Sequence, residues 1–323
     1  MDKKSLLKLQ NVNGFVEEDD KVTVFVTKKL SMNRINKLIK DSSSPWKDKD
    51  VIPKNVVVAR KGLLRKGIEK KTDVIQLGHV RALSDRKQYD PLIGGVEIGL
   101  FGKPFVGTAG MVVTLEKYGN LLLSGQFKSF GSILRKFGLT PVRKNFYWTN
   151  AHVANESVLS QKNGSAIQQS PLTKRRCGIV AFSLPMKKVG LNEFDDAFVE
   201  LYDMLEVRNN IVQVGEPSGF GDPIKGDKVE KYGRTSGYSK GTFSYRGATL
   251  KIDYGDGVGE LEMTGLDWFK LPSSPGDSGS VIVRESDKVV VSHLFAGNGQ
   301  GDTFGIPSVK VKDRVGFELY KEV

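Results

Sequence analysis

Short apolar runs separated by Gly, Asn, Pro or Lys recur from residue 96 to the end of the chain, in two sets. The first set comprises VEIGL, GTAGMVVTL, NLLLSG, FYWTNAHV, GIVAFSL and DAFVELY. The second comprises DKVEKYGR, GTFSYRGATLKIDYG, ELEMTG, DWFKL, GSVIVRE, KVVVSHLFAG and FGIPSVKV. Many short strands with little helix predict an all-β barrel or sandwich. Two such sets predict two barrels, with a junction near residues 203–215.

The first 95 residues have a different pattern. KVTVFVTK (21–28) alternates as a strand does, and SMNRINKLIKD has the spacing of a short helix that begins after Ser31. Strands are also predicted at 55–60 and 72–80. The chain is therefore divided into a basic α/β extension (1–95), a first barrel (96–203) and a second barrel (204–323).

One segment inside the first barrel, 126–145, interleaves phenylalanines with lysines and arginines. Such a mixture can grip single-stranded nucleic acid. We favour a long loop with a short amphipathic helix, since loops of this length often serve as lids or partner contacts.

Charge and cysteine content narrow the function classes. Residues 1–95 hold 21 Lys/Arg against 12 Asp/Glu, a net charge of +9, out of +12 for the whole chain. Nucleic-acid binding by this extension is an alternative, but the lysines are scattered and no nucleic-acid motif accompanies them. The only cysteine is Cys177, no secretory signal is evident and no apolar run approaches the roughly 20 residues of a membrane span. These features predict a cytoplasmic protein without disulfides, structural zinc or membrane association.

The segment SSPGDSGSVIV (273–283) raises the question of whether Ser278 is a turn residue or a nucleophile. A serine hydroxyl needs a base to take its proton, and the chain has three histidines. His79 lies on an apolar strand and is interpreted as packed or at the surface. His293 follows the serine in a strand, and we expect it to face solvent or a small pocket. His152 lies where an apolar strand enters a polar turn, a position from which a base can reach a neighbouring lobe.

A carboxylate must hold the imidazole in the correct tautomer. EFDDAFVEL places two aspartates before a strand. We assign this role to Asp195. Because the two aspartates are adjacent, the sequence alone leaves Asp196 as an alternative.

TNAH, DDAFVEL and PGDSGS follow one another with gaps of 43 and 83 residues between His152, Asp195 and Ser278. This order resembles the chymotrypsin/trypsin-like serine peptidases over residues 96–323. The resemblance implies two antiparallel six-stranded β-barrels, with His152 and Asp195 on the first and Ser278 on the second. It also implies an oxyanion hole formed by the backbone N–H groups of Gly276 and Ser278.

VEKYGRTSGYSKGT (229–242) is similar to a hairpin of secreted bacterial peptidases of this group that has a cysteine at each end. Glu230 and Lys240 occupy those ends here, and we expect an ion pair between them. The resemblance further implies that Lys231 pairs with Asp277 and thereby shapes the oxyanion turn. The order of motifs along the chain is also similar to that in intracellular trypsin-like proteins of the plant narrow-leaf type and their bacterial relatives.

These features predict a serine endopeptidase that acts through an acyl-enzyme on a protein or peptide substrate, without a cofactor. The resemblance places the substrate pocket at Pro272, on its base, with Phe295, Ala296 and Gly297 on one wall and 303–305 opposite. No acidic residue falls at the base of this pocket, so we do not expect the protein to select Arg or Lys side chains. A pocket in which His293 favours an acidic substrate side chain is an alternative. The alternative function is a catalytically idle trypsin-like fold that serves as a protein or nucleic-acid interaction module. Self-association into a homo-oligomer is compatible with the sequence.

Overall fold

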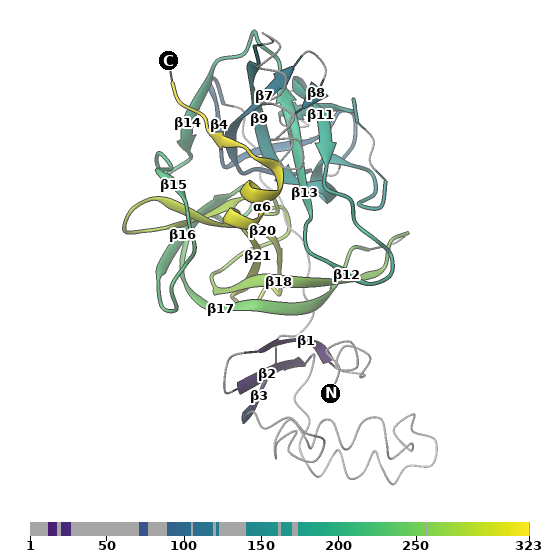
Figure 1. Cartoon of the computed structure of the whole chain (residues 1–323), viewed down its shortest axis with the longest axis vertical. Coiled ribbons are helices and arrows are strands. Elements are labelled where there is room, and N and C mark those ends of the chain that lie inside the picture. The colour runs from purple at the N-terminus through teal and green to yellow at the C-terminus, as the bar shows by residue number, and fades with distance from the viewer. Residues whose placement is uncertain are drawn as a thin grey trace.

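The computed structural model describes residues 12–17, 21–26, 71–76, 89–104, 106–118, 121–122, 140–160, 163–169, 174–255 and 257–322. Two large sheets make up most of this structure. Figure 1 shows them as two lobes, the first containing β7, β9, β11 and β13 and the second containing β16, β17, β18, β20 and β21.

The first lobe is a closed barrel. Its sheet order is β7-β9-β13-β11-β10-β5-β6, and all these pairings are antiparallel. Only Gly110 separates β6 from β7, so the two ends of the order are one bent strand and the sheet closes with six strands. Its members are β5 (Val96–Leu100), β6 (Val106–Ala109), β7 (Met111–Tyr118), β9 (Val142–Asn150), β10 (Ala166–Gln169), β11 (Arg175–Ser183) and β13 (Asp196–Leu201).

The second lobe closes in the same way. The order β18-β21-β20-β19-β16-β17 is completed by a pairing between β17 and β18, again antiparallel throughout. The two predicted six-stranded barrels are therefore confirmed, and the fold is the chymotrypsin-like double barrel. The members of the second barrel are β16 (Lys228–Gly233), β17 (Gly237–Asp253), β18 (Glu260–Lys270), β19 (Val281–Arg284), β20 (Val289–Gly297) and β21 (Asp302–Pro307).

Short elements connect the two barrels. β12 precedes β13 in the chain yet pairs with β18, and β22 follows the second barrel yet pairs with β7. Each barrel thus pairs with a short strand from the other side of the predicted boundary at 203/204. The boundary itself stays a prediction. These elements and the remaining ones are β4 (Leu92–Gly94), β8 (Leu121–Leu122), α5 (Ala151–Ala154), β12 (Leu191–Asn192), β14 (Val207–Ile211), β15 (Gly219–Phe220), α6 (Ser308–Val315) and β22 (Glu318–Leu319).

The described part of the N-terminal extension consists of β1 (Val12–Glu17), β2 (Lys21–Val26) and β3 (Lys71–Gln76). β2 and β3 confirm two strand predictions, whereas β1 was not predicted. β1 pairs with β17 at Gly14↔Leu250, so the extension adds strands to the second lobe's sheet (Figure 1). The helix predicted after Ser31, the strand at 55–60, His79 and most of segment 126–145 lie outside the described residues.

Aromatic rings fill the space where the barrels meet. Trp148 of β9 packs against Phe198 and Phe317, with ring centroids 6.5 and 5.0 Å away, and all three are fully buried. Cys177 is buried within the first barrel, and burial raises the pKa of its thiol to about 12. Within the described ranges, no helix has the length and apolar character needed to cross a membrane.

Candidate active site

His152 and Asp195 meet at one end of the first barrel. β9 ends at Asn150, opposite Asp196 at the start of β13, and the chain then turns into α5. This turn brings His152 beside Asp195: Nδ1 lies 2.6 Å from Oδ2, and the backbone N–H of His152 donates to Oδ1 at 3.1 Å. Asp195 is fully buried and His152 is 17% exposed. The carboxylate therefore fixes the ring orientation and leaves Nε2 as the nitrogen available for chemistry.

The second barrel also supplies a group to Asp195. Tyr254, just past the end of β17, donates its hydroxyl to Oδ2 at 3.0 Å, and its ring packs edge-on to His152 at 5.9 Å between centroids. Burial, reinforced by the Asp195 carboxylate, raises the pKa of the Tyr254 hydroxyl well above its ordinary value. The tyrosine consequently stays a hydrogen-bond donor to the carboxylate at neutral pH.

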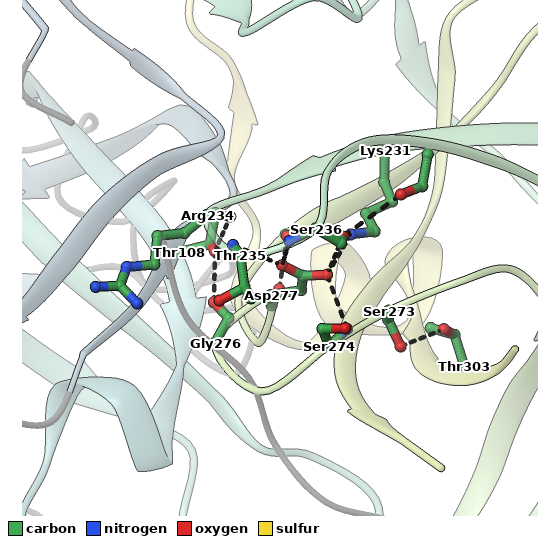
Figure 2. Close-up of polar contacts among 12 residues, drawn as sticks. Thr108, Lys231, Arg234, Thr235, Ser236, Ser273, Ser274, Gly276, Asp277 and Thr303 are labelled. Carbon is green, nitrogen blue, oxygen red and sulfur yellow. Dashed lines mark hydrogen bonds and ion pairs between the residues drawn. The ribbon is translucent and has the colours of Figure 1, made fainter. Parts of the chain in front are cut away.

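Asp277 is a fully buried carboxylate surrounded by donors (Figure 2). Lys231 contributes its ammonium, and both side chains are 0% exposed. Oδ1 accepts the backbone N–H groups of Thr235 and Ser236 at 3.1 and 3.2 Å, and Oδ2 accepts that of Ser274 at 3.1 Å. Burial lowers the pKa of Lys231, and the attraction of Asp277 opposes this shift. The ion pair between Lys231 and Asp277 is present, and it ties the 273–278 loop to the hairpin of β16 and β17.

Two threonine hydroxyls hold the peptide planes on either side of Gly276. Thr235 Oγ1 donates to the carbonyl of Pro275 at 2.8 Å, and Thr108 Oγ1 donates to the carbonyl of Gly276 at 2.7 Å (Figure 2 shows the second contact). Because N–H and C=O point in opposite directions across a trans peptide, the first contact turns the N–H of Gly276 away from Thr235. Gly276 has φ +102°, in the region that favours glycine. Among the described residues, neither Gly276 N–H nor Ser278 N–H donates a hydrogen bond, so both amides are available to an oxygen.

Ser278 lies at the junction of the barrels and is 1% exposed. Its carbonyl accepts the N–H of Thr108 at 2.8 Å, and its hydroxyl donates to the carbonyl of Phe295 at 3.1 Å. A Cβ on Gly107 would lie 2.3 Å from Val153 Cγ2 and 2.9 Å from the Ser278 carbonyl oxygen. Ser278 and the residue after His152 therefore converge on one glycine of β6.

No hydrogen bond joins Ser278 Oγ to His152 in this structure, and within the described part of the chain His152 Nε2 has no hydrogen-bond partner. Gly279 keeps the serine close to the first barrel, because a Cβ there would lie only 1.9 Å from the carbonyl oxygen of Thr108.

The two adjacent aspartates bind different histidines. Asp196 Oδ1 lies 2.7 Å from His293 Nδ1, and both side chains are 0% exposed. The expectation that His293 faces solvent or a small pocket is therefore wrong: almost every residue of β20 is buried, and the His293 ring packs against Trp148 of the first barrel. With its ring enclosed in this way, His293 is not a pocket residue that selects an acidic side chain. Asp196 is the partner of His293 and does not contact His152.

The residues predicted to form the substrate pocket are not all placed as expected. Pro272 is exposed, whereas Phe295 and Ala296 are buried. The contact with Gly297 comes from Ser273, whose Oγ would lie 2.4 Å from a Cβ at that glycine. Thr303 Oγ1 and Ser273 Oγ are hydrogen-bonded at 2.6 Å, as Figure 2 shows. Ser273, rather than Pro272, is therefore the residue of this segment that contacts Gly297 and Thr303.

Glu230 and Lys240 face each other in the β16–β17 ladder, as predicted, but they do not form an ion pair. Glu230 pairs with Lys288, and Lys240 pairs with Glu285. Both partners come from the β19–β20 turn beside β16. A long lysine side chain can reach several carboxylates, and the register alone does not select one.

Several residues at this site were not identified from the sequence. Thr108 and Thr235 stand in the quoted motifs GTAG and GRTSG, and only their positions within those motifs could have drawn attention to them. The sequence around Tyr254 gives no sign of its role, and neither does the sequence around His293 and Asp196. In both cases the contacts are made between the two barrels. Within the described residues, no group of three or more His, Cys, Asp or Glu side chains is arranged to hold a metal ion.

Comparisons with known proteins describe the fold. No protein-family model matches the chain, and no curated protein matches it. Among solved structures, Nocardiopsis protease (NAPase) is 17% identical with a TM-score of 0.49, covering 72% of this chain and 100% of that chain. Thermobifida fusca protease A has 17% identity and a TM-score of 0.47, covering 71% and 98%. Cellulomonas bogoriensis chymotrypsin has 17% identity and a TM-score of 0.47, covering 72% and 100%.

The similar structures are serine proteases of the chymotrypsin/trypsin-like kind. None of the comparisons supports closeness to the plant narrow-leaf type. The double-barrel fold rests on the two closed rings of strands.

Proposed function

We propose that this protein is a serine endopeptidase that cleaves peptide bonds through an acyl-enzyme. The observation that carries the proposal is the contact of 2.6 Å between His152 Nδ1 and the buried Asp195, which leaves Nε2 without a partner in the described structure. An imidazole held in this way is prepared to accept a proton at Nε2.

In the proposed reaction, Ser278 Oγ attacks the substrate carbonyl and His152 Nε2 takes its proton. For this step the hydroxyl must exchange the Phe295 carbonyl, its present acceptor, for His152. His152 then returns the proton to the leaving amine, and water hydrolyses the ester by the reverse steps.

The tetrahedral intermediate carries a negative oxygen, which two preorganised amides can stabilise. The N–H groups of Gly276 and Ser278 are assigned this role. Thr235, Thr108 and the Lys231–Asp277 ion pair support the turn that presents them. Loss of one such donor typically costs about 100- to 1,000-fold in rate.

A fluorophosphonate probe tests the proposal, because it reacts with an activated serine. We expect wild-type protein to be labelled and Ser278→Ala to be unlabelled. Ser218→Ala, at an exposed hydroxyl that bonds the carbonyl of Asp287, should be labelled like wild type. Absence of labelling in well-folded wild-type protein would overturn the proposal and leave the idle interaction module as the reading. A peptide-library cleavage profile with Ser278→Ala as control would then define the substrate.

A further inference from the structure

A second His–Asp pair lies behind the candidate site, and the proposed reaction assigns it no step. Asp196 and His293 are both fully buried, with Oδ1 and Nδ1 2.7 Å apart. The other ring nitrogen of His293, Nε2, lies 3.0 Å from the carbonyl oxygen of Gly279. Trp148 Nε1 donates to the same Asp196 oxygen at 2.7 Å. Each polar end of the imidazole is therefore engaged.

The hydrogen-bond partner of Nε2 fixes the proton at that ring nitrogen. A carbonyl oxygen only accepts, so Nε2 must carry a hydrogen to bond Gly279. Nδ1 faces the Asp196 carboxylate at 2.7 Å and, at a longer 3.3 Å, the side-chain amide nitrogen of Asn150. The contact with Asp196 is the shorter of the two, and a hydrogen bond to a carboxylate is stronger than one to a neutral group.

The pair spans the two barrels at a particular point. Asp196 belongs to β13 of the first barrel and directly follows Asp195, whereas His293 belongs to β20 of the second. The carbonyl that His293 holds belongs to Gly279, the residue after Ser278. One side chain contact thus connects the neighbour of the candidate orienting aspartate to the neighbour of the candidate nucleophile.

Apolar contacts surround this link but cannot fix position in the same way. The Trp148 ring packs against the His293 ring at 4.4 Å between centroids. Packing of rings tolerates small sliding movements, whereas hydrogen bonds are directional. A misplacement of about 1 Å at a reacting group can cost about 100-fold in rate.

We propose that Asp196 and His293 are positioning residues: the pair locks the two barrels in the register that places Ser278 opposite His152 and Asp195. This inference rests on the proposed function for its effect on rate. The structural part of the inference, that the pair fixes the Ser278–Gly279 segment against the first barrel, does not depend on the proposed function.

The test compares two uncharged double variants. Asp196→Asn with His293→Leu removes the carboxylate and the imidazole, keeps an acceptor for Trp148 and removes the donor to Gly279. Asp196→Asn with His293→Gln is similar in volume but offers an amide N–H near the position of Nε2. We expect the leucine variant to react with the fluorophosphonate about 100-fold more slowly than wild type, and the glutamine variant to recover at least about tenfold of that loss.

A matched control removes an ion pair that lies within one barrel. Lys117 and Glu200, the latter also on β13, pair at 2.6 Å. Lys117→Gln with Glu200→Gln should label at the wild-type rate. Wild-type labelling in the leucine variant would overturn the proposal. Equal labelling rates in the leucine and glutamine variants would also overturn it, because the two side chains fill a similar volume and only glutamine can donate a hydrogen bond to Gly279.

Hydrogen exchange supplies a readout that does not need activity. The N–H of Thr108 donates to the Ser278 carbonyl across the barrels at 2.8 Å. In the leucine variant this amide should exchange faster relative to amides of β9, which bond within the first barrel. If wild-type protein is not labelled, the proposed function fails and Thr108 exchange alone decides: unchanged relative exchange overturns the positioning role.

If the leucine variant does not fold, single substitutions replace it. The amide nitrogen of His293→Gln lies near the position of Nε2, and that of His293→Asn near the position of Nδ1. The proposal expects the glutamine variant to label at least about tenfold faster, and equal rates overturn it.

Discussion

Asp195 and Asp196 are neighbours in the chain, and each holds Nδ1 of a histidine, but the two histidines have different surroundings. His152 is 17% exposed and its Nε2 has no partner among the described residues, whereas His293 is fully buried and its Nε2 bonds a carbonyl. The same two side-chain types can therefore prepare a base or lock a structure. The state of the second ring nitrogen makes the difference.

The largest expected effect comes from the His152–Asp195 pair, in which Nε2 has no hydrogen-bond partner among the described residues. His152→Ala removes the proposed base and should lower fluorophosphonate labelling by about 10,000-fold or more. Because the ring is partly exposed, the free energy of unfolding should change little compared with a buried histidine. Urea denaturation monitored beside labelling separates the two effects, and labelling at the wild-type rate would contradict the contrast between the pairs.

A buried pair that uses lysine in place of histidine extends the comparison. Lys231→Met leaves the Asp277 carboxylate buried without its cation, which costs about 3–5 kcal/mol in comparable cases. Urea denaturation should show this loss. Lys240→Met, on the opposite strand of the same hairpin and at the surface, serves as the control and should leave stability nearly unchanged. Equal effects of the two substitutions would show that burial of the Lys231 pair is unimportant.

Asp267 is a buried carboxylate whose partners, an arginine and a serine, belong to the same barrel. Its Oδ1 lies 3.0 Å from Arg246 Nε, and Ser292 Oγ donates to Oδ2 at 3.1 Å. Burial nevertheless raises its pKa from the ordinary 3.8 to about 6. The folded state therefore holds the proton more tightly than the unfolded state, and this contribution to stability is present below about pH 4 and lost as the pH rises through about 6.

The predicted measurement is the difference in unfolding free energy between wild type and Asp267→Asn from pH 4 to 7. Wild type should lose up to about 3 kcal/mol relative to the variant over this range. Parallel pH profiles of the two proteins would show that the carboxyl of Asp267 has no raised pKa.

Tyr254→Phe should have the smallest effect. It removes one hydrogen bond to a charged group, which is worth about 1.5–3 kcal/mol, but Asp195 keeps both of its contacts with His152. We expect a fall of about tenfold in labelling rate, and a free energy of unfolding lowered by no more than about 1.5–3 kcal/mol. Tyr238→Phe, which loses a hydroxyl contact with Glu230, is the control, and an equal fall in both variants would argue against a role at Asp195.

Sequence reasoning reached the residues that stand at strand ends and in turns. His152, Asp195 and Ser278 lie in short motifs whose order along the chain is informative. The number and spacing of the apolar runs predict two β units, and the resemblance carried by those motifs implies that each unit is a six-stranded barrel. The choice between Asp195 and Asp196 was open because adjacent residues share every sequence signal. It is decided by register, since Asn150 opposite Asp196 turns the chain toward Asp195.

What could not be predicted depends on contacts across the barrels. Burial of His293 required knowing that β20 is covered on both faces. The nearly continuous apolar run of VVVSHLFAG is compatible with such burial, but it does not show that the polar step Ser292–His293 is enclosed as well. Tyr254 reaches Asp195 from beyond the end of a 17-residue strand. The partners of Glu230 and Lys240 depend on the β19–β20 turn, which the hairpin sequence does not contain.

The burial of Cys177 has a practical consequence for measuring motion between the barrels. It is the only thiol in the chain, it is inaccessible, and its pKa of about 12 keeps the reactive thiolate scarce. A cysteine introduced at exposed Met204 or Ile224, after and before strands of different barrels, would therefore be alkylated against a silent background. The native protein is already suited to site-specific fluorescent or spin labels, without removal of its own cysteine.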